Sequence, residues 1–501
     1  MSKNKRESVI IIGAGPGGLT AAMILAKRGF EVEVFEKKNT PGGRNANLSL
    51  GDFNFDLGPT FLMMKEILDD MFNKAGVVSD EILDFKRLEP MYRLQFDDRQ
   101  LHPTTDREKM KAQISQAFPG KEDRLDTFLK KECKRFETLI PCLKRPYSSL
   151  ASLLSPDLLK AAPHLAVGRS LYDMLYNYFE DPKMTLSFTF QSKYLGMSPW
   201  DCPGLFAMLS YMEHRSGIYH VQGGLSQISQ KMAETAQANG AKIHLGTPVK
   251  KLQIGLHKDV TGVELESGET VTADEVIINA DFAHAMTNLV PNDVLRKYTP
   301  AKLQNKEFSC STYMMYLGLD KIYDMPHHTI VFADDYKRNV EEVFNSKIIS
   351  EDISFYIRNA SVTDSTLAPP GKSAVYILVP VPNLRGEIDW LKEGPRLRQR
   401  VFDTLAEKTS MTDIEKHIET EQTITPTEWE QEHDVYCGAT FNLVHSLGQM
   451  LFLRPHNKFE ELNHCYLVGG GTHPGSGLPT IYESGRIAAD MIGKKYGVSG
   501  I

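Results

Sequence analysis

The hydrophobic pattern near the N-terminus predicts a strand, a helix and a second strand in close succession. Residues 9–12 are an unbroken apolar run, Val-Ile-Ile-Ile, of the kind that forms a buried parallel strand. Residues 19–27 carry apolar side chains at helical spacing and are followed by Gly29, a residue that commonly ends helices. Residues 31–35 form a second short strand that ends on Glu36. This order predicts a βαβ unit on a parallel sheet, and hence an α/β fold.

The pattern changes character twice further along the chain. Between residues 105 and 218 it predicts helices with wide apolar faces, at 125–143, 150–162, 170–179 and 202–212. Between residues 306 and 430 it predicts a mixed sheet, with strands at 311–319, 354–359 and 374–381 and a helix at 395–408. The other segments predict a hairpin at 47–56, helices at 63–76, 226–239 and 480–492, and strands at 241–249, 260–266, 270–273 and 274–279. The two kinds of region interleave, so we expect discontinuous domains.

Three glycines between the first strand and the first helix have the spacing of a dinucleotide-binding turn. Gly13 permits the tight turn, Gly15 lets the backbone approach a pyrophosphate, and Gly18 allows close packing of helix on strand. The helix N-terminus offers N–H groups to the phosphates, and Glu36 can accept hydrogen bonds from both ribose hydroxyls. A glycine-rich turn without a ligand is the alternative, but the complete unit favours an adenine dinucleotide. The predicted contacts include the neighbouring residues Pro16, Gly17 and Lys37.

The segment after the second strand indicates which dinucleotide is bound. It reads Thr-Pro-Gly-Gly-Arg and ends on Gly43 and Arg44. An arginine here can reach the pyrophosphate as a permanently charged fork, although an ordinary surface arginine is the alternative. This extension resembles the FAD-dependent amine oxidases and desaturases, which implies that the ligand is FAD.

Two further segments resemble flavin-contacting parts of the same superfamily. The Gly-Pro pair fixes a sharp turn at residues 58–59, which in that superfamily lies under the flavin, and Val249 stands where similar enzymes place a backbone contact to adenine. Near the C-terminus a short strand leads to a glycine-rich loop and the closing helix, whose N-terminus can stabilise negative charge on a reduced flavin ring. The predicted flavin contacts in these segments are Gly58, Pro59, Thr60, Val249, Gly470, Gly471, Gly477, Leu478 and Pro479.

Composition narrows the class of protein. The chain has 501 residues, 41% of them hydrophobic, and a formal net charge of −7, which suits two or three globular domains and argues against nucleic acid as a partner. Its six cysteines form no C-x-x-C pair and no cysteine–histidine set at metal spacing, so we expect reduced thiols and no metal site. Residues 1–8 are polar and leave no room for a signal peptide, and no apolar run is long enough to span a bilayer.

Several motifs together resemble the bacterial carotenoid desaturases, which act on phytoene or diapophytoene. They are the N-terminal fingerprint and the stretches 55–60, 188–191, 194–196, 367–371, 379–382, 389–390, 452–457 and 471–475. The resemblance implies a Rossmann-type FAD-binding domain like that of glutathione reductase and amine oxidases, with an interleaved α+β substrate domain and a helical membrane-facing cap. We expect the FAD-binding domain at 1–104, 219–305 and 431–501, the cap at 105–218 and the substrate domain at 306–430.

The middle of the chain is rich in methionine and aromatic residues, which on composition alone is typical of a helical core. The resemblance instead favours a tunnel for a long apolar polyene. The sparsely charged stretch 188–212 would then dock on the inner face of the cell membrane, and the protein would be cytoplasmic and peripheral. The oligomeric state is left open.

The reaction that the resemblance implies is dehydrogenation of a CH₂–CH₂ unit, with hydride transfer to the flavin. Candidate catalytic residues are His473, which could tune the ring or accept a proton, and Asp181, beside the expected tunnel. A structural loop histidine and a surface acid at a helix end are the alternatives. Other functions considered are oxidation of carotenoid terminal methyl groups, carotenoid isomerisation, amine oxidation, and a prenyl-binding escort protein without flavin. The sequence leaves open a C30 or C40 substrate and the number of desaturation steps.

Overall fold

A five-stranded parallel sheet contains the predicted βαβ unit. The structure is a computed structural model that describes residues 6–498, so residues 1–5 of the polar N-terminal segment lie outside the described residues. In this sheet β1 (Ser8–Ile12) lies between β2 (Glu31–Phe35) and β13 (Glu275–Ile278). The outer strands are β9 (Lys242–His244) and β19 (Cys465–Leu467), which gives the order β19-β13-β1-β2-β9. Segments from both ends and the middle of the chain therefore share one sheet.

Three helices form the layer next to this sheet. The central one, α1 (Pro16–Lys27), is buried along almost its whole length because α9 (Ser226–Ala238) and α15 (Leu478–Lys495) pack against it. Close packing with α15 requires Gly485, since a Cβ there would lie 2.8 Å from Thr20 Cβ. The short helices α2 (Lys65–Lys74) and α10 (Phe282–Asn288) and the antiparallel strands β10 (Val249–Ile254), β11 (Val260–Leu265) and β12 (Thr270–Thr272) complete this half of the molecule.

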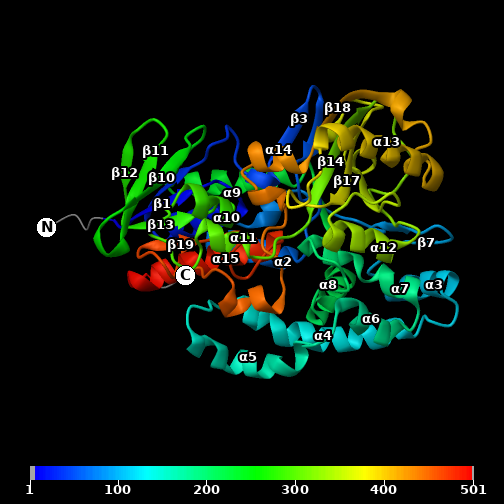
Figure 1. The fold of residues 1–501 in the computed structure, drawn as a ribbon, viewed down its shortest axis with the longest axis horizontal. Coiled ribbons are helices and arrows are strands. Elements are labelled where there is room, and N and C mark those ends of the chain that lie inside the picture. The colour runs from blue at the N-terminus through cyan, green and yellow to red at the C-terminus, as the bar shows by residue number, and fades with distance from the viewer. Residues whose placement is uncertain (1–5, 499–501) are drawn as a thin grey trace.

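A second, seven-stranded sheet forms the other half (Figure 1). Its strands, in spatial order, are β18 (Ile418–Ile424), β14 (Ser311–Leu319), β17 (Ser373–Val381), β16 (Phe355–Asn359), β15 (His328–Val331), β6 (Arg93–Gln95) and β7 (Gln100–Leu101). One face packs on α13 (Trp390–Lys408), and the other packs on the hairpin of β3 (Asn47–Leu50) and β4 (Phe53–Asp56). Both faces are covered, so every residue of β14 is buried.

A group of helices lies below both sheets in Figure 1. It consists of α3 (Arg107–Ala117), α4 (Arg124–Leu143), α5 (Pro156–Ala161), α6 (Leu171–Phe179), α7 (Pro182–Ser187) and α8 (Ala207–Ser216). We call these helices the cap. Smaller elements are the strand pair β5 (Phe85–Arg87) and β8 (Tyr219–Val221) and the helices α11 (Pro300–Gln304), α12 (Tyr336–Glu341) and α14 (Pro426–Gln431).

The structure differs from the sequence analysis in several elements. The predicted strand 241–249 is two strands, because the backbone turns at Gly246 and Pro248. Helix α13 begins at Trp390 rather than at residue 395, since Lys392 and Glu393 already donate to the Asp389 carbonyl. The predicted helix 150–162 is divided at Ser155 into a short 3₁₀ helix, Leu150–Leu154, and α5. Strands β15 and β18 were not predicted, and β6 and β7, from the segment 1–104, pair with the second sheet and not with the parallel one.

Candidate functional site

The glycine-rich turn after β1 forms a compact cradle at the N-terminus of α1. Gly13 has φ +95°, and a Cβ on Gly18 would lie 2.5 Å from the Gly13 carbonyl oxygen, so larger residues do not fit at either position. Asn279, at the end of β13, donates hydrogen bonds from Nδ2 to the carbonyls of Gly13 (2.9 Å) and Gly15 (3.2 Å). These bonds hold the turn open toward the helix N-terminus, where free N–H groups favour an anion.

Glu36 lies beside this cradle at the end of β2. Its carboxylate is 6% exposed and accepts hydrogen bonds from the backbone N–H groups of Ala14 and Lys38, both at 2.8 Å. Each oxygen keeps lone pairs for further donors, as two ribose hydroxyls would require. The Glu36 carbonyl accepts from Thr247 N–H, which brings the start of β10 and its first residue, Val249, to the same side of the sheet.

Arg44 and Gly43 lie across the cradle from α1. A Cβ on Gly43 would lie 3.6 Å from Gly15 Cα, so the two glycine segments face each other closely. Arg44 Nη1 donates to the Thr440 carbonyl (2.9 Å) and lies 3.8 Å from Asp281 Oδ2. The predicted site residue Lys37 instead forms an ion pair with Asp434 at the surface.

The turn at Gly58 lies against Arg44. A Cβ on Gly58 would lie 2.6 Å from the Arg44 carbonyl oxygen, so the close approach requires glycine. Tyr376 donates a hydrogen bond to the Gly58 carbonyl (3.0 Å), and Thr60 Oγ1 is 2.7 Å from the Tyr356 hydroxyl. Both tyrosines belong to the second sheet, so this turn joins the two halves of the molecule at the predicted flavin position.

The closing loop runs from β19 to α15 along the same cavity wall. Gly477 has φ +108° and precedes α15, whose N-terminal residues Leu478 and Pro479 line the cavity together with Gly470. The predicted residue Gly471 is absent from the described cavity lining and packs against Phe282 and Asn442.

Two buried residues that the sequence analysis did not single out hold this loop. The Arg454 guanidinium is fully buried and donates to the carbonyls of Leu443, Val444, Gln449, Gly470 and Thr472. Burial lowers its pKa to about 9. His445 Nε2 accepts a hydrogen bond from the Ser476 N–H (3.1 Å). The stretch 452–457 marked the position of Arg454 as a family pattern, but not its role.

A largely apolar cavity of about 310 Å³ extends from these loops to the second sheet and to the segment Phe190–Leu195 between α7 and α8. Its wall on the first side includes Arg44, Gly58, Pro59, Thr60, Gly470, Gly477, Leu478 and Pro479. Its wall on the other side is mainly aromatic and aliphatic and includes Phe61, Met63, Phe190, Tyr194, Met314, Ile330, Phe355, Tyr356 and Leu378. The glycine cradle, the carboxylate of Glu36 and this wall together fit an adenine dinucleotide whose reactive ring borders an apolar chamber.

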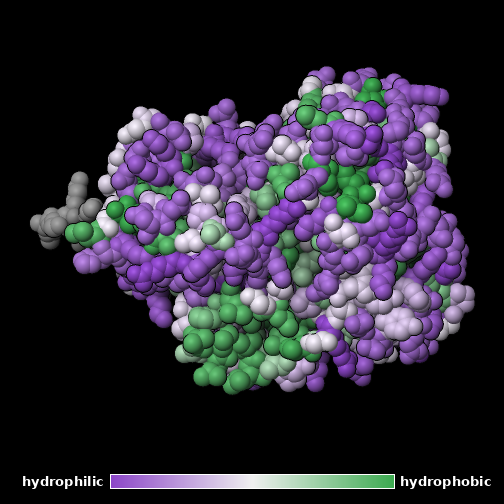
Figure 2. Space-filling model, in the orientation of Figure 1, coloured by the Kyte–Doolittle hydropathy of each residue, from purple (hydrophilic) through white to green (hydrophobic). Residues whose placement is uncertain are grey.

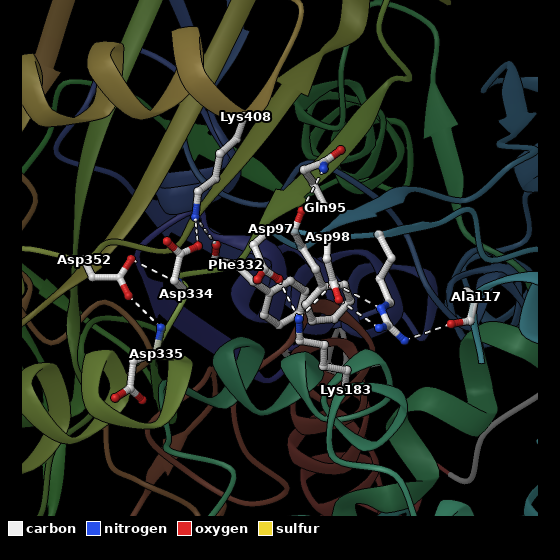
Figure 3. Close-up of polar contacts among 12 residues, drawn as sticks. Gln95, Asp97, Asp98, Ala117, Lys183, Phe332, Asp334, Asp335, Asp352 and Lys408 are labelled. Carbon is white, nitrogen blue, oxygen red and sulfur yellow. Dashed lines mark hydrogen bonds and ion pairs between the residues drawn. The ribbon is translucent and has the colours of Figure 1, made fainter. Parts of the chain in front are cut away.

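The two candidate catalytic residues lie outside the described cavity lining. His473 is 1% exposed, packs edge-on against Tyr147 with ring centroids 5.0 Å apart, and has its pKa lowered to about 3 by burial. Its backbone N–H donates a hydrogen bond to the Pro455 carbonyl, and its carbonyl accepts one from Asn457 Nδ2. Asp181 caps α7 by accepting a hydrogen bond from Met184 N–H (2.9 Å). Lys183, two residues further on, binds Asp97 and Asp98 in the turn between β6 and β7 (Figure 3).

Comparison with known proteins agrees with this geometry. The family model "Flavin containing amine oxidoreductase" matches residues 16–493. A 4,4'-diapophytoene desaturase (4,4'-diapolycopene-forming) from Methylomonas sp. is 54% identical over 98% of this chain and 96% of its own. An all-trans-zeta-carotene desaturase from Myxococcus xanthus is 35% identical over 98% of this chain and 94% of its own.

A solved structure shows the same fold at much lower identity. Cyclohexylamine oxidase from Brevibacterium oxydans aligns with a TM-score of 0.62 and 16% identity, covering 98% of this chain and 100% of its own. The α/β FAD-binding fold, the cofactor and the enzyme class expected from the resemblance are thus confirmed, and the escort alternative is set aside. The chain belongs to the flavin-containing amine oxidoreductases and, within them, to the carotenoid desaturases of bacterial type, which are FAD-dependent enzymes that oxidise CH–CH bonds.

Proposed function

We propose that this chain desaturates 4,4'-diapophytoene, a C30 hydrocarbon, and thereby extends its conjugated polyene. The observation that carries the proposal is the continuous cavity, which leads from the flavin loops into an aromatic and aliphatic chamber. A hydrocarbon offers no polar group to bind, so its position must come from the shape and apolar surface of such a wall. The 54% identity over nearly the full length of a diapophytoene desaturase supports the C30 substrate.

The contacts proposed for FAD follow the geometry of the loops. The turn at Gly13, Gly15 and Gly18, with Pro16 and Gly17, would hold the pyrophosphate, Glu36 the ribose and Val249 the adenine. Arg44, Gly43, the turn 58–60 and the loop at Gly470, Gly477, Leu478 and Pro479 would border the ring. When bound, FAD supplies the hydride acceptor. The protein supplies a dry cavity that orients the carbon chain and excludes water.

The structure supports positioning roles for the two earlier catalytic candidates. His473 lies in the closing loop, and its backbone contacts fix the path of that loop to α15. Asp181 begins α7, which carries Lys183 to the second sheet. We therefore assign neither residue a contact with the substrate.

The product spectrum tests the reaction. Purified FAD-loaded protein, supplied in lipid with diapophytoene or with phytoene, should convert the C30 precursor faster and yield products with stepwise longer absorption maxima. Oxidised end groups without new double bonds would instead favour a terminal-methyl oxidase, and a changed isomer of unchanged mass would favour an isomerase. Either result would contradict the proposal.

We further propose that the protein docks on an anionic membrane through the part of the cap around α5. The stretch expected to do so, 188–212, is mostly buried and packs within the core. A continuous apolar surface instead lies over α5 at the bottom of Figure 2. Its exposed side chains are Leu150 (69% exposed), Leu154 (72%), Leu159 (60%), Val167 (69%) and, on the adjoining segment, Leu453 (51%).

The charge around this surface favours anionic lipid. The segment 144–169 contains four basic residues and one acid, although the whole chain has a net charge of −7; they are Lys144, Arg145, Lys160, Arg169 and Asp157. Exposed leucines rimmed by basic side chains are typical of helices that lie in a membrane interface. Within the described residues, no helix has the length and hydropathy needed to cross a bilayer.

Flotation with vesicles tests this surface. The native protein should float with phosphatidylcholine vesicles containing phosphatidylglycerol, and less with phosphatidylcholine alone. Replacing Leu150, Leu154 and Leu159 together by glutamate should abolish flotation. Leu391→Glu is the matched control, because Leu391 is 93% exposed on α13, outside this surface. Equal flotation of the triple variant and the native protein would contradict the assignment.

A further inference from the structure

The cavity wall contains few groups that could accept a proton. Removing hydrogen from a CH₂–CH₂ unit releases a hydride and a proton, and the proton needs an acceptor close to the substrate. Among the described residues that line the cavity there is no carboxylate. The titratable lining residues are Arg44, Tyr92, Lys193, Tyr194, Cys310, His328, Tyr356 and Tyr376.

Most of these groups are unsuited to the role. Burial raises the pKa of the four tyrosines, and that of Cys310 to about 12, while arginine stays protonated. His328 has Nδ1 bonded to the Tyr356 hydroxyl (2.6 Å), and its Nε2 is buried without a hydrogen-bond partner. Burial and the nearby Arg358 charge hold the pKa of His328 well below its usual value. Lys193 is the lining group that remains.

The amine of Lys193, a cavity-lining residue, has a single hydrogen-bond partner among the described residues. Its Nζ donates a hydrogen bond to Ser354 Oγ (2.6 Å). Ser354 Oγ in turn donates to Asn339 Oδ1 (2.8 Å), so the serine can only accept from the lysine. A neutral amine fits this arrangement with one N–H bonded and its lone pair free, whereas an ammonium would hold further donors in an apolar wall.

The electrostatic environment also favours the neutral amine. Burial lowers the pKa of Lys193 to about 7, and no carboxylate lies within ion-pair distance of it among the residues that the structure describes. The titratable groups that face it are the Cys310 thiol, ahead of β14, and Tyr336 on α12. The face of the Tyr336 ring, whose centroid is 4.8 Å from Nζ, attracts the charged form, but burial has the larger effect on the pKa. Lys347 faces the same thiol and adds positive charge to this part of the wall.

We propose that Lys193 is the proton acceptor of the desaturation, a role that rests on the proposed function. One C–H bond of the substrate gives up its electron pair with the hydrogen, as hydride, to the bound flavin. The adjacent C–H bond then breaks, its proton forms a bond to Lys193 Nζ, and its electron pair becomes the new carbon–carbon π bond. The two electrons removed from the substrate thus reside on the flavin, and the amine carries the proton.

A direct measurement of the lysine tests its protonation without turnover. The FAD-loaded protein, produced with ¹³Cε-labelled lysine, should show one lysine Cε resonance that titrates near pH 7. That resonance should be missing from K193M. A Lys193 resonance that titrates above pH 9 would overturn the proposal, because the group would then be protonated at neutral pH.

Turnover provides the second readout. With the native protein, the desaturation rate should rise about tenfold per pH unit below pH 7 and level off above it, since the neutral amine is the active form. K193M should lose at least about 100-fold in rate and become independent of pH. K193R can keep a hydrogen bond to Ser354 but cannot lose its proton, so it should be equally slow. K306M, which removes a half-buried lysine outside the described cavity lining, is the control and should behave as the native protein.

The outcomes separate this proposal from the proposed function. Flavin absorbance and thermal unfolding verify that each variant is folded and loaded. If K193M or K193R keeps the native rate and pH profile, Lys193 only packs the wall and the proposal is wrong. If the native protein converts neither hydrocarbon although Lys193 titrates near pH 7, the proposed function is what fails, and the proton-acceptor role fails with it.

Discussion

At the scale of single residues, the closing loop depends on a side chain that does not line the cofactor cavity. Arg454 is fully buried, and its guanidinium donates hydrogen bonds to carbonyl groups of the closing loop and of the segment before it. A planar guanidinium offers five donors in fixed directions, which the compact lysine ammonium cannot reproduce. The loop proposed to border the flavin ring therefore derives its shape from one arginine.

We expect R454K to lose most of its bound FAD. Losing two charged hydrogen bonds and leaving buried carbonyls without donors should lower the free energy of unfolding by about 3 kcal/mol. The ratio of flavin absorbance to protein absorbance and thermal unfolding measure the two effects. R396K is the matched control, because Arg396 lies on the exposed face of α13. A fully flavinated R454K with native unfolding would contradict this role.

At the scale of elements, periodicity predicted those that bury a regular face. The hairpin β3–β4 and strands β1, β2, β14, β16 and β17 were predicted within about one residue, because each is largely apolar or flanked by clear turns. Helix α1 begins at Pro16, three residues before the predicted start. Strand β18 was missed because it is an edge strand whose glutamates, Glu419 and Glu421, pair with Lys372 and Arg398 and mask the strand pattern. Strands β6 and β7, of three and two residues, are too short to show an alternation of apolar and polar positions.

In the candidate site, too, residues that act through their own backbone could be predicted, and residues that act through partners remote in the sequence could not. The glycine turns could be predicted because each acts through its own backbone. Asn279, Arg454 and Lys193 could not be assigned roles, since their partners lie in remote parts of the chain. His473 and Asp181 were singled out by their place in motifs, and only the folded chain shows that they face away from the cavity.

Strand β14 gives a prediction at this scale. Gly318 lies where the hairpin crosses the sheet, and a Cβ there would lie 2.6 Å from Phe53 Cδ2 and 2.6 Å from Thr420 Cγ2. G318A should therefore overpack this contact and destabilise the protein by about 1–3 kcal/mol, measured by urea unfolding. G255A, whose added Cβ has ordinary contacts of 3.6 Å or more, should change stability little. If G318A is as stable in urea as the native protein, the hairpin can move away from β14 to make room for the added methyl group.

At the scale of the whole molecule, a buried ion pair connects the hairpin β3–β4 to the second sheet. Asp56, at the end of β4, lies 2.8 Å from Arg358 Nη2 on β16, and both side chains are at most 2% exposed. Asp56 Oδ1 also accepts from the N–H of Ser226, the first residue of α9. One carboxylate thus ties together the hairpin, helix α9 beside the parallel sheet and a strand of the second sheet, next to the turn 58–60.

Removing the arginine should destabilise this junction strongly. R358M leaves the Asp56 carboxylate buried without its counter-charge, which typically costs about 3–5 kcal/mol, and should lower the urea midpoint. The double variant R358M/D56N no longer buries an unpaired charge and should recover part of the loss. If R358M is as stable as the native protein, water must reach Asp56 and the two halves are not held together by this pair.

The order of strands in the parallel sheet has a consequence for biosynthesis. The first strand to leave the ribosome, β1, pairs with β13, whose residues follow about 260 positions later, and the sheet is completed only by β19 near the C-terminus. A nascent chain halted before Cys465 therefore lacks both an edge of the sheet and the loop proposed to border the flavin ring. Flavin capture must then await release of the finished polypeptide, so premature termination anywhere upstream should leave colourless, aggregation-prone fragments rather than partially active enzyme.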